Sequence, residues 1–494
     1  MIFFKNFKIK LTSWLIVSML IGIPFFSYPT TAENLPELND SASQALNAQD
    51  ELILGKRLMA DARARLNLID DPILESYIKA LTHQLAVHSS RTLPDINISI
   101  ALNPIINAFA APGGQIAINT GLLTATQSEG EFASVIAHEI SHHSQRHIPR
   151  MLENAKKASL PSTAAVLGGL LIGGQVGIAT IATVRAAVLS NRLAYSRGYE
   201  QEADAAGMKL LAKAGFDPTQ MPTFFERLEK QSQIQGGEGP EFLRTHPLSG
   251  NRIAEAHSRV KSLNLFVEDR AELSTLLNFE LAQNRAIALY GEPLDKITDT
   301  FKSALKLADK DSRFAPAYGL SLAYLRSGDT QLAAQSIDQS FANEAQHDLA
   351  MLTQAEIAIK DDNKPAAIGL LDKLIVKHPK NLAVGLTRAR TLKRMGRLDD
   401  AFQQARKMMR TFPDQPQAKL LLADIAGADG NLAQAAFHKS EFYYNLGHYK
   451  KAARVLTPYA SLQSDDISNY LASSIKDLQH QISQADARAT ALKL

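Results

Sequence analysis

The chain has 494 residues, which is enough for two or more domains and a large buried core. Apolar residues make up 45% of it and charged residues 21%, as in ordinary globular proteins. A net charge of +3, with no basic run interleaved with aromatic residues, argues against binding to nucleic acid or polyanions. Cysteine is absent, which excludes thiolate zinc ligands and disulfides and is typical of a compartment that oxidises free thiols.

Residues 1–32 have the features of an export signal. Three lysines form a basic start, an uncharged apolar stretch runs from Leu11 to Phe26, and Thr30–Ala32 offers small residues to signal peptidase. This stretch is shorter than the about 20 apolar residues of a membrane-spanning helix, which favours a cleaved signal over a retained anchor. We therefore expect an exported protein whose mature chain begins near Glu33.

Two scaffold helices are predicted within residues 41–90, followed by two short strands. Apolar and polar residues alternate from Asp95 to Ala101, which indicates a strand with one buried face. Residues 107–114 predict a tight loop, and Gln115–Asn119 predicts a second strand joined by a glycine-permitted hairpin. Two roles stay open for the second strand. It either only completes the core, or it binds an extended substrate by strand addition.

Residues 137–143, Ala-His-Glu-Ile-Ser-His-His, carry the clearest chemical motif. Apolar residues at helical spacing place this motif on a helix, so His138 and His142 lie on one face and can both bind one Zn²⁺. Glu139 projects beside them, toward the position of a metal-bound water. The alternative is a surface helix with incidental histidines, but this spacing is rare by chance in a chain with 13 histidines.

Residues 158–184 contain no charged residue and include five glycines between Gly168 and Gly177. The length would allow a membrane span, whereas the glycines disfavour a stable helix. Three interpretations stay open: a true span, a contact with a membrane surface, and a mobile or closely packed segment over the active site.

Ser190–Gly207 predicts a second helix that carries acidic and small residues. Glu200 would complete a two-histidine, one-carboxylate metal site and leave the fourth position to water. Asp204, one turn later, could accept the second ring N–H of a ligand histidine. Glu202 projects about 200° away from Glu200 and is expected to face solvent. An acidic helix start alone usually indicates only a solvated face, so the metal role depends on the upstream histidines.

A third motif surrounds His246, which is followed by Pro247. The proline restricts the backbone before a helix that begins near Ser249, and it could hold His246 at a fixed angle. Arg252 would follow on the first turn of that helix. A His-Pro pair alone is usually only a loop.

Together, the motifs of residues 107–253 resemble the zinc endopeptidase family that includes the prenyl-protein protease and the heat-shock membrane protease. The resemblance implies one Zn²⁺ per chain, bound by His138, His142 and Glu200, with Glu139 as the general base. It also implies that Asp204 supports a ligand and that His246 regulates the metal site. Metzincins are excluded because they need a third histidine at position 148, which is isoleucine here.

The C-terminal part repeats with a period of 34 residues. The period is visible in two sets of positions: Gly328, Asp362, Gly396 and Gly430, and Ala333, Ala367, Ala401 and Ala435. A turn, small residues and a closing proline at this period are typical of tetratricopeptide (TPR) repeats. Such an array presents a concave surface, which either captures a partner or substrate or only props the protease.

We therefore predict a mainly α, α+β fold, with a zincin-like metalloprotease domain that contains a small sheet, followed by a TPR α-solenoid. The predicted parts are a signal peptide (1–32), a protease domain (33–265), a linking helix (266–285) and the repeats (286–490). The protease and the repeats are expected to have separate cores.

The predicted function is that of a periplasmic zinc-dependent endopeptidase. The resemblance to exported, repeat-bearing bacterial members implies quality control of outer-membrane β-barrel proteins. Unfolded or misassembled proteins would be its substrates, and the β-barrel assembly machinery would contact its repeats. Two alternatives stay open: a chaperone or adaptor with a vestigial zinc site, and a membrane-integral protease that uses residues 158–184. The intact histidine and glutamate set argues against a vestigial site.

Overall fold

The structure is a computed structural model. It describes residues 46–91, 93, 96–157, 197–234, 240–262, 273, 275–337, 344–460 and 468–492. The predicted export signal, the first part of the predicted linking helix and the glycine-rich segment 158–184 lie outside these residues. Within the described ranges, no helix combines the length and hydrophobicity that crossing a membrane requires.

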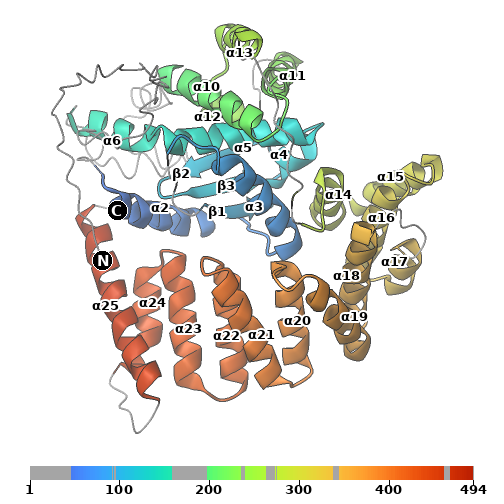
Figure 1. Cartoon of the computed structure of the whole chain (residues 1–494), viewed down its shortest axis with the longest axis vertical. Helices are drawn as coiled ribbons and strands as arrows, with labels where there is room; N and C mark the ends of the chain where they lie inside the picture. The colour runs from blue at the N-terminus through green and yellow to red at the C-terminus, as the bar shows by residue number, and fades with distance from the viewer. Residues whose placement is uncertain are drawn as a thin grey trace, which may run out of the picture. The chain divides into compact units, whose positions relative to one another are not determined.

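Helices and one small sheet come first along the chain, and helices alone follow (Figure 1). The first group comprises α2 (Ala48–Arg63), α3 (Pro72–Ala86), β1 (Asn97–Ala101), β2 (Ala108–Ala111), β3 (Gln115–Asn119), α4 (Thr120–Ala125), α5 (Glu129–Ser144), α6 (His147–Lys157), α10 (Arg197–Lys213), α11 (Gln220–Ile234), α12 (Glu241–Thr245) and α13 (Gly250–Ser262). The second group comprises α14 (Phe279–Tyr290), α15 (Leu294–Leu307), α16 (Phe314–Ser327), α17 (Thr330–Ile337), α18 (Glu344–Lys360), α19 (Lys364–Lys377), α20 (Leu382–Arg394), α21 (Leu398–Thr411), α22 (Pro416–Ala428), α23 (Leu432–Asn445), α24 (Tyr449–Leu456) and α25 (Asn469–Ala491), with a 3₁₀ turn at Thr457–Tyr459. The mainly α fold with a small sheet is thus confirmed.

The sheet has the strand order β1-β3-β2, with β1 parallel and β2 antiparallel to β3. The first half of the predicted loop, residues 107–114, is therefore strand β2, which turns into β3 at Gly113 and Gly114. Alanine-rich β2 is buried along its whole length, so it shows neither high strand propensity nor alternation. Because β3 is paired on both sides, strand addition along Gln115–Asn119 is wrong. The strand with an outer edge beside α5 is β2.

Helix α5 begins at a defined cap and runs through the core. The Ser128 hydroxyl accepts a hydrogen bond from the Glu131 backbone N–H at 3.1 Å, and the Glu131 carboxylate accepts one from the Gln127 N–H at 2.7 Å. Its apolar residues are fully buried, as their spacing predicted: Phe132, Val135, Ile136 and Ile140.

Helix α10 lies along α5 in Figure 1, and a glycine allows the close approach. A Cβ atom at Gly207 would lie only 3.3 Å from the Ala137 carbonyl carbon and from the His138 nitrogen. The small residue at 207 therefore lets the helix that carries Glu200 pack directly against the helix that carries His138 and His142.

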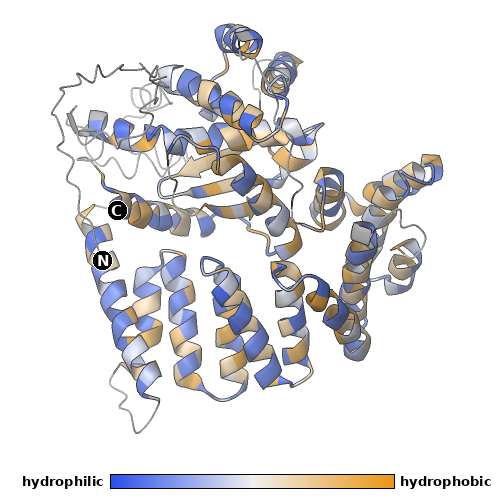
Figure 2. Ribbon diagram, in the orientation of Figure 1, coloured by the Kyte–Doolittle hydropathy of each residue, from blue (hydrophilic) through white to orange (hydrophobic). Residues whose placement is uncertain are grey.

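The repeat period is visible in the backbone. The four predicted turn positions all adopt the left-handed conformation, with φ values of 88°, 55°, 75° and 80° at Gly328, Asp362, Gly396 and Gly430. Three are glycine, which carries no Cβ penalty there, and aspartate is among the few other residues that tolerate it. Hydrophobic residues alternate with hydrophilic ones along helices α22 to α25 (Figure 2), so each helix buries its apolar face against its neighbours.

One hydrophobic core extends from the first group of elements into the repeats. Its buried side chains come from α3, α5, α11, α14, α16, α18 and α19, including Tyr77, Phe132, Phe225, Ala286, Tyr318, Leu349 and Leu371. Arg285 on α14 reinforces this connection, because its guanidinium lies 2.7 Å from Asp71 at the start of α3 and 2.8 Å from Glu356 on α18. The expectation of separate cores is therefore wrong.

Candidate metal centre

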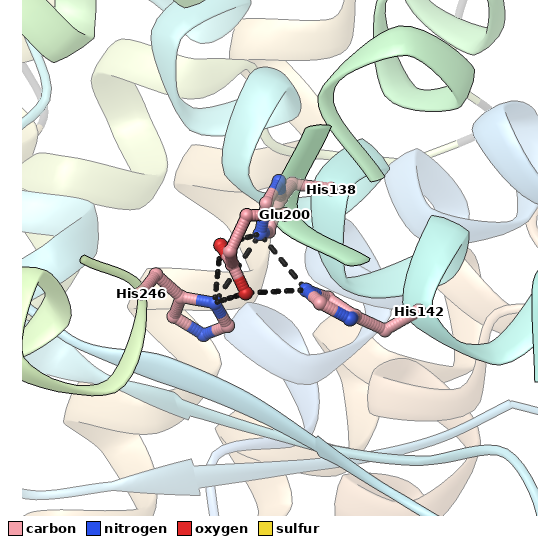
Figure 3. A group of neighbouring side chains, drawn as sticks. All are labelled: His138, His142, Glu200 and His246. Carbon is pink, nitrogen blue, oxygen red and sulfur yellow. Dashed lines mark hydrogen bonds and ion pairs between the residues drawn. The ribbon is translucent and has the colours of Figure 1, made fainter. Parts of the chain in front are cut away.

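Four side chains from separate parts of the chain point toward one another (Figure 3). His138 and His142 come from α5, Glu200 from the first turn of α10, and His246 follows α12 directly. All four are buried, and their candidate ligand atoms lie within 4.8 Å of one another. The structure thus brings together residues that the sequence separates by up to 108 positions.

The spacing of these atoms fits one zinc ion. His138 Nε2 lies 3.0 Å from His142 Nε2 and 3.3 Å from His246 Nδ1. Glu200 oxygens lie 3.2 Å from His246 Nδ1 and 3.6 Å from His142 Nε2. Four ligands at zinc–nitrogen and zinc–oxygen distances of about 2.0–2.1 Å stand about 3.3 Å apart in a tetrahedron. The donor set is also the one that zinc prefers, so these residues could hold it in a four-coordinate site.

Glu139 lies beside this cluster with an unsatisfied oxygen. The carboxylate is buried, and its Oε1 atom has no hydrogen-bond partner among the described residues, although His246 Nε2 lies 3.4 Å away. Burial raises the pKa of this carboxyl above its usual range, and the neighbouring His246 and His138 oppose that shift only in part. A buried carboxylate with a free oxygen and a raised pKa can accept a proton from a water molecule placed at the cluster.

Asp204 and Arg252 contact the candidate ligand residues of the cluster. Asp204 Oδ1 lies 3.0 Å from His138 Nδ1, so the predicted contact with a ligand histidine is confirmed. The Arg252 guanidinium donates two hydrogen bonds of 2.8 Å to Asp204 and lies 3.1 Å from Glu200. No role was predicted for Arg252, because nothing in the local sequence indicates a partner 48 positions away.

These contacts favour a positive charge bound at the cluster, either a proton or a metal ion. Burial alone would raise the pKa of Asp204, but hydrogen bonds with His138 and Arg252 outweigh it and lower that pKa. Burial would lower the pKa of His138, but hydrogen bonds with Asp204 and Glu200 raise it to about 10. A metal ion at His138 would replace the proton that this environment favours.

Glu202 lies at the surface, away from the cluster, as its helical angle predicted. Its carboxylate is 44% exposed, and it also lies 2.7 Å from Arg150 Nη1 and 3.1 Å from His147 Nε2, two contacts with α6 that were not predicted.

Known proteins resemble this chain over both groups of elements. Residues 72–260 match the model of peptidase family M48, and residues 318–381 and 386–439 match a tetratricopeptide repeat model. The beta-barrel assembly-enhancing protease of Escherichia coli (strain K12) is 27% identical over 461 residues, which cover 93% of each chain.

Two further relatives match shorter parts of the chain. A putative beta-barrel assembly-enhancing protease of Vibrio cholerae is 35% identical over 337 residues, which cover 65% of this chain and 68% of the relative. The mitochondrial metalloendopeptidase OMA1 of Arabidopsis thaliana is 34% identical over 177 residues, which cover 35% of this chain and 34% of the relative.

Proposed function

This chain belongs to peptidase family M48 and is a zinc metalloendopeptidase, and from that premise we propose that it degrades unfolded or misassembled outer-membrane β-barrel proteins in the periplasm. His138, His142 and Glu200 hold the zinc ion, and Glu139 is the general base. The observation that carries this proposal is the convergence of the buried ligand atoms, within 4.8 Å of one another, beside a Glu139 oxygen that makes no hydrogen bond among the described residues.

His138, His142 and Glu200 would hold a zinc ion, which would supply Lewis-acid chemistry, lowering the pKa of a bound water to about 7 and polarising the substrate carbonyl. The side chains do the rest. Glu139 accepts a proton at Oε1 and later returns it to the leaving amine. Asp204 holds the His138 ring in the tautomer that leaves Nε2 free. Arg252 balances the two acidic side chains, so the negative charge of Glu200 and Asp204 is not buried unpaired.

The repeats provide the partner surface in this proposal. Relatives that share nearly the whole chain are named beta-barrel assembly-enhancing proteases, which supports the β-barrel assembly machinery as the partner of the repeats. The same relatives support periplasmic export, in agreement with the predicted signal at residues 1–32. A contact of residues 158–184 with a membrane surface stays a prediction.

A direct assay tests the proposed function. The zinc-loaded protein should cleave a urea-denatured outer-membrane β-barrel protein after dilution, and it should spare the same protein folded in detergent micelles. A chelator should abolish cleavage and added zinc should restore it. If the protein instead only suppresses aggregation of the unfolded chain and leaves it intact, the chaperone alternative is correct.

Two roles compete for His246: a fourth ligand that keeps the zinc site closed, and a donor to the developing oxyanion. We propose the first role, that of a latch. Its Nδ1 atom lies 3.2 Å from Glu200 and 3.3 Å from His138 Nε2, within reach of the same metal ion, and a fourth protein ligand excludes the catalytic water. The enzyme would then rest closed until its target displaces the histidine.

Substitution separates the two roles of His246. His246→Ala should increase basal cleavage of a generic unfolded substrate while zinc stays bound, because the fourth position then opens to water. His257→Ala, on an exposed histidine of α13, is the matched control and should leave cleavage unchanged. A decrease of about 10²–10³-fold with zinc retained would instead make His246 a donor to the developing oxyanion.

A further inference from the structure

A fourth histidine, His147, lies behind the candidate metal centre. Its Nδ1 atom is 2.8 Å from His142 Nδ1, which is the ring nitrogen that faces away from the other ligand atoms. Its Nε2 atom is 3.1 Å from the Glu202 carboxylate, and its ring is fully buried. His142, His147 and Glu202 therefore form a chain of hydrogen bonds that leads from the cluster to the surface.

The chemistry of imidazole fixes the direction of each bond. A neutral histidine that binds a metal through Nε2 carries its proton on Nδ1, so His142 donates to His147. His147 must then accept at Nδ1 and carry its own proton on Nε2, which it donates to Glu202. No other pair of neutral tautomers satisfies both contacts. The arrangement matches the one around His138, where Asp204 accepts the second ring proton.

A break in the helix puts His147 in this place. In a continuous helix, a residue five positions after His142 would point about 140° away from it. Arg146 instead adopts a left-handed backbone with φ of 54°, which ends α5 and redirects the chain at the start of α6. Such a conformation is costly for arginine and persists only where its surroundings hold it. Here the Arg146 guanidinium bonds to the Leu46 carbonyl at 2.6 Å and pairs with Glu51.

Neighbouring side chains also hold the His147 ring. Tyr199 stacks on it, with ring centroids 4.7 Å apart and planes 17° apart. Arg150 connects the two neighbours of the His147 ring. Its guanidinium lies 4.7 Å from the Tyr199 ring and also bonds to Glu202. Tyr199 directly precedes Glu200, so the residues that fix His147 belong to the same helix as a candidate metal ligand.

We propose that His147 and Glu202 are positioning residues for the zinc ligand His142, fixing its ring orientation and its tautomer through the bonds His142 Nδ1–His147 Nδ1 and His147 Nε2–Glu202. This inference rests on the proposed zinc site. Hydrogen-bonded partners of a ligand histidine usually contribute about 10–100-fold to metal affinity.

Zinc affinity measured by competition with a chromophoric chelator tests this proposal. His147→Phe keeps a ring for Tyr199 to stack on but removes both nitrogens, and it should weaken zinc binding by about 10–100-fold. His147→Gln supplies an amide oxygen for His142 and an amide N–H for Glu202, so it should recover most of that loss. Glu202→Ala should weaken binding in the same direction by a smaller factor. Because Glu202 is partly exposed, this variant is expected to fold. It therefore still tests the series of hydrogen bonds if substitutions at the buried His147 unfold the protein.

The pair His257 and Glu226 provides the matched control. This histidine and glutamate are 2.6 Å apart on α13 and α11, and both are exposed. His257→Phe and Glu226→Ala should leave zinc affinity unchanged. Nitrogen-15 spectra of histidine-labelled, zinc-loaded protein give an independent measurement, in which His147 should be protonated on Nε2 and not on Nδ1.

The results separate the inference from the function it rests on. Wild-type zinc affinity in folded His147→Phe and in Glu202→Ala, or a His147 protonated on Nδ1, would overturn the positioning role alone. Failure of the unaltered protein to bind zinc would overturn the proposed function itself, and the positioning role with it.

Discussion

Glu139→Gln should lower proteolysis by at least about 10²-fold and leave zinc bound. The glutamine has the size of the glutamate but cannot accept a proton, and Glu139 is not among the clustered ligand atoms. The measurement is the cleavage rate of an unfolded β-barrel protein, together with the zinc content of the same sample. Glu226→Gln removes an exposed glutamate and is the control. Equal activity in Glu139→Gln would refute the role of this residue as the base.

The pH dependence of cleavage follows from the same side chain. Because burial raises the pKa of Glu139, the carboxyl takes up its proton at a higher pH than an ordinary glutamate does. A protonated base cannot accept another proton, so kcat/KM should fall as the pH falls through this raised pKa. The acidic limb should therefore lie above the usual glutamate range, and the residual activity of Glu139→Gln should lack it.

Glu200→Ala or His142→Ala should reduce the zinc content to well under one ion per chain. Each substitution removes one of the atoms that define the tetrahedral spacing, and Glu200→Ala also removes a partner of Arg252. Metal analysis after dialysis against zinc-free buffer measures the effect. Asp204→Ala is a weaker case and should lower affinity by about 10–100-fold, because Asp204 touches a ligand and not the metal.

Glu202→Ala is the matched comparison for Glu200, two residues away on the same helix. It should still bind one zinc ion per chain when zinc is in excess, even though its affinity is lower. If Glu202→Ala loses the metal and Glu200→Ala keeps it, the carboxylate ligand has been assigned to the wrong residue.

Local periodicity explains which parts of the site could be predicted from the sequence. The pairs His138/His142 and Glu200/Asp204 are each four residues apart, and a helix places such residues on one face wherever it lies. The repeat period likewise predicted the turn positions, including the one at Asp362. In each case the signal is a regular spacing along the chain, which can be seen without knowing any distant contact.

Contacts that depend on distant or irregular backbone could not be predicted. Helical spacing turns His147 away from His142, and no glycine or proline announces the left-handed break at Arg146. Arg252 meets Asp204 only through the packing of α13 against α10. The short strand β2 has too little alternation and too many alanines to stand out.

The shared core was missed for a related reason, since an amphipathic helix reveals that it needs a partner but not which one. Helix α14 is the clearest example. It contacts α3 and α4 as well as α16, and its Leu281 and Ala286 belong to the shared core. Thus α14, which begins inside the stretch predicted to link two domains, joins their interiors.

The continuous core has a consequence for how the enzyme is made and broken down. The last candidate metal residue, His246, is synthesised 138 residues before Val384, where the core cluster ends. Until this stretch has been added and packed, helix α5 lacks part of its core, so the metal site is expected to be complete only together with the early repeats. The same dependence applies to breakdown. A cut that removes the early repeats should expose part of this core and destabilise the metal site, so we expect no active protease fragment from it.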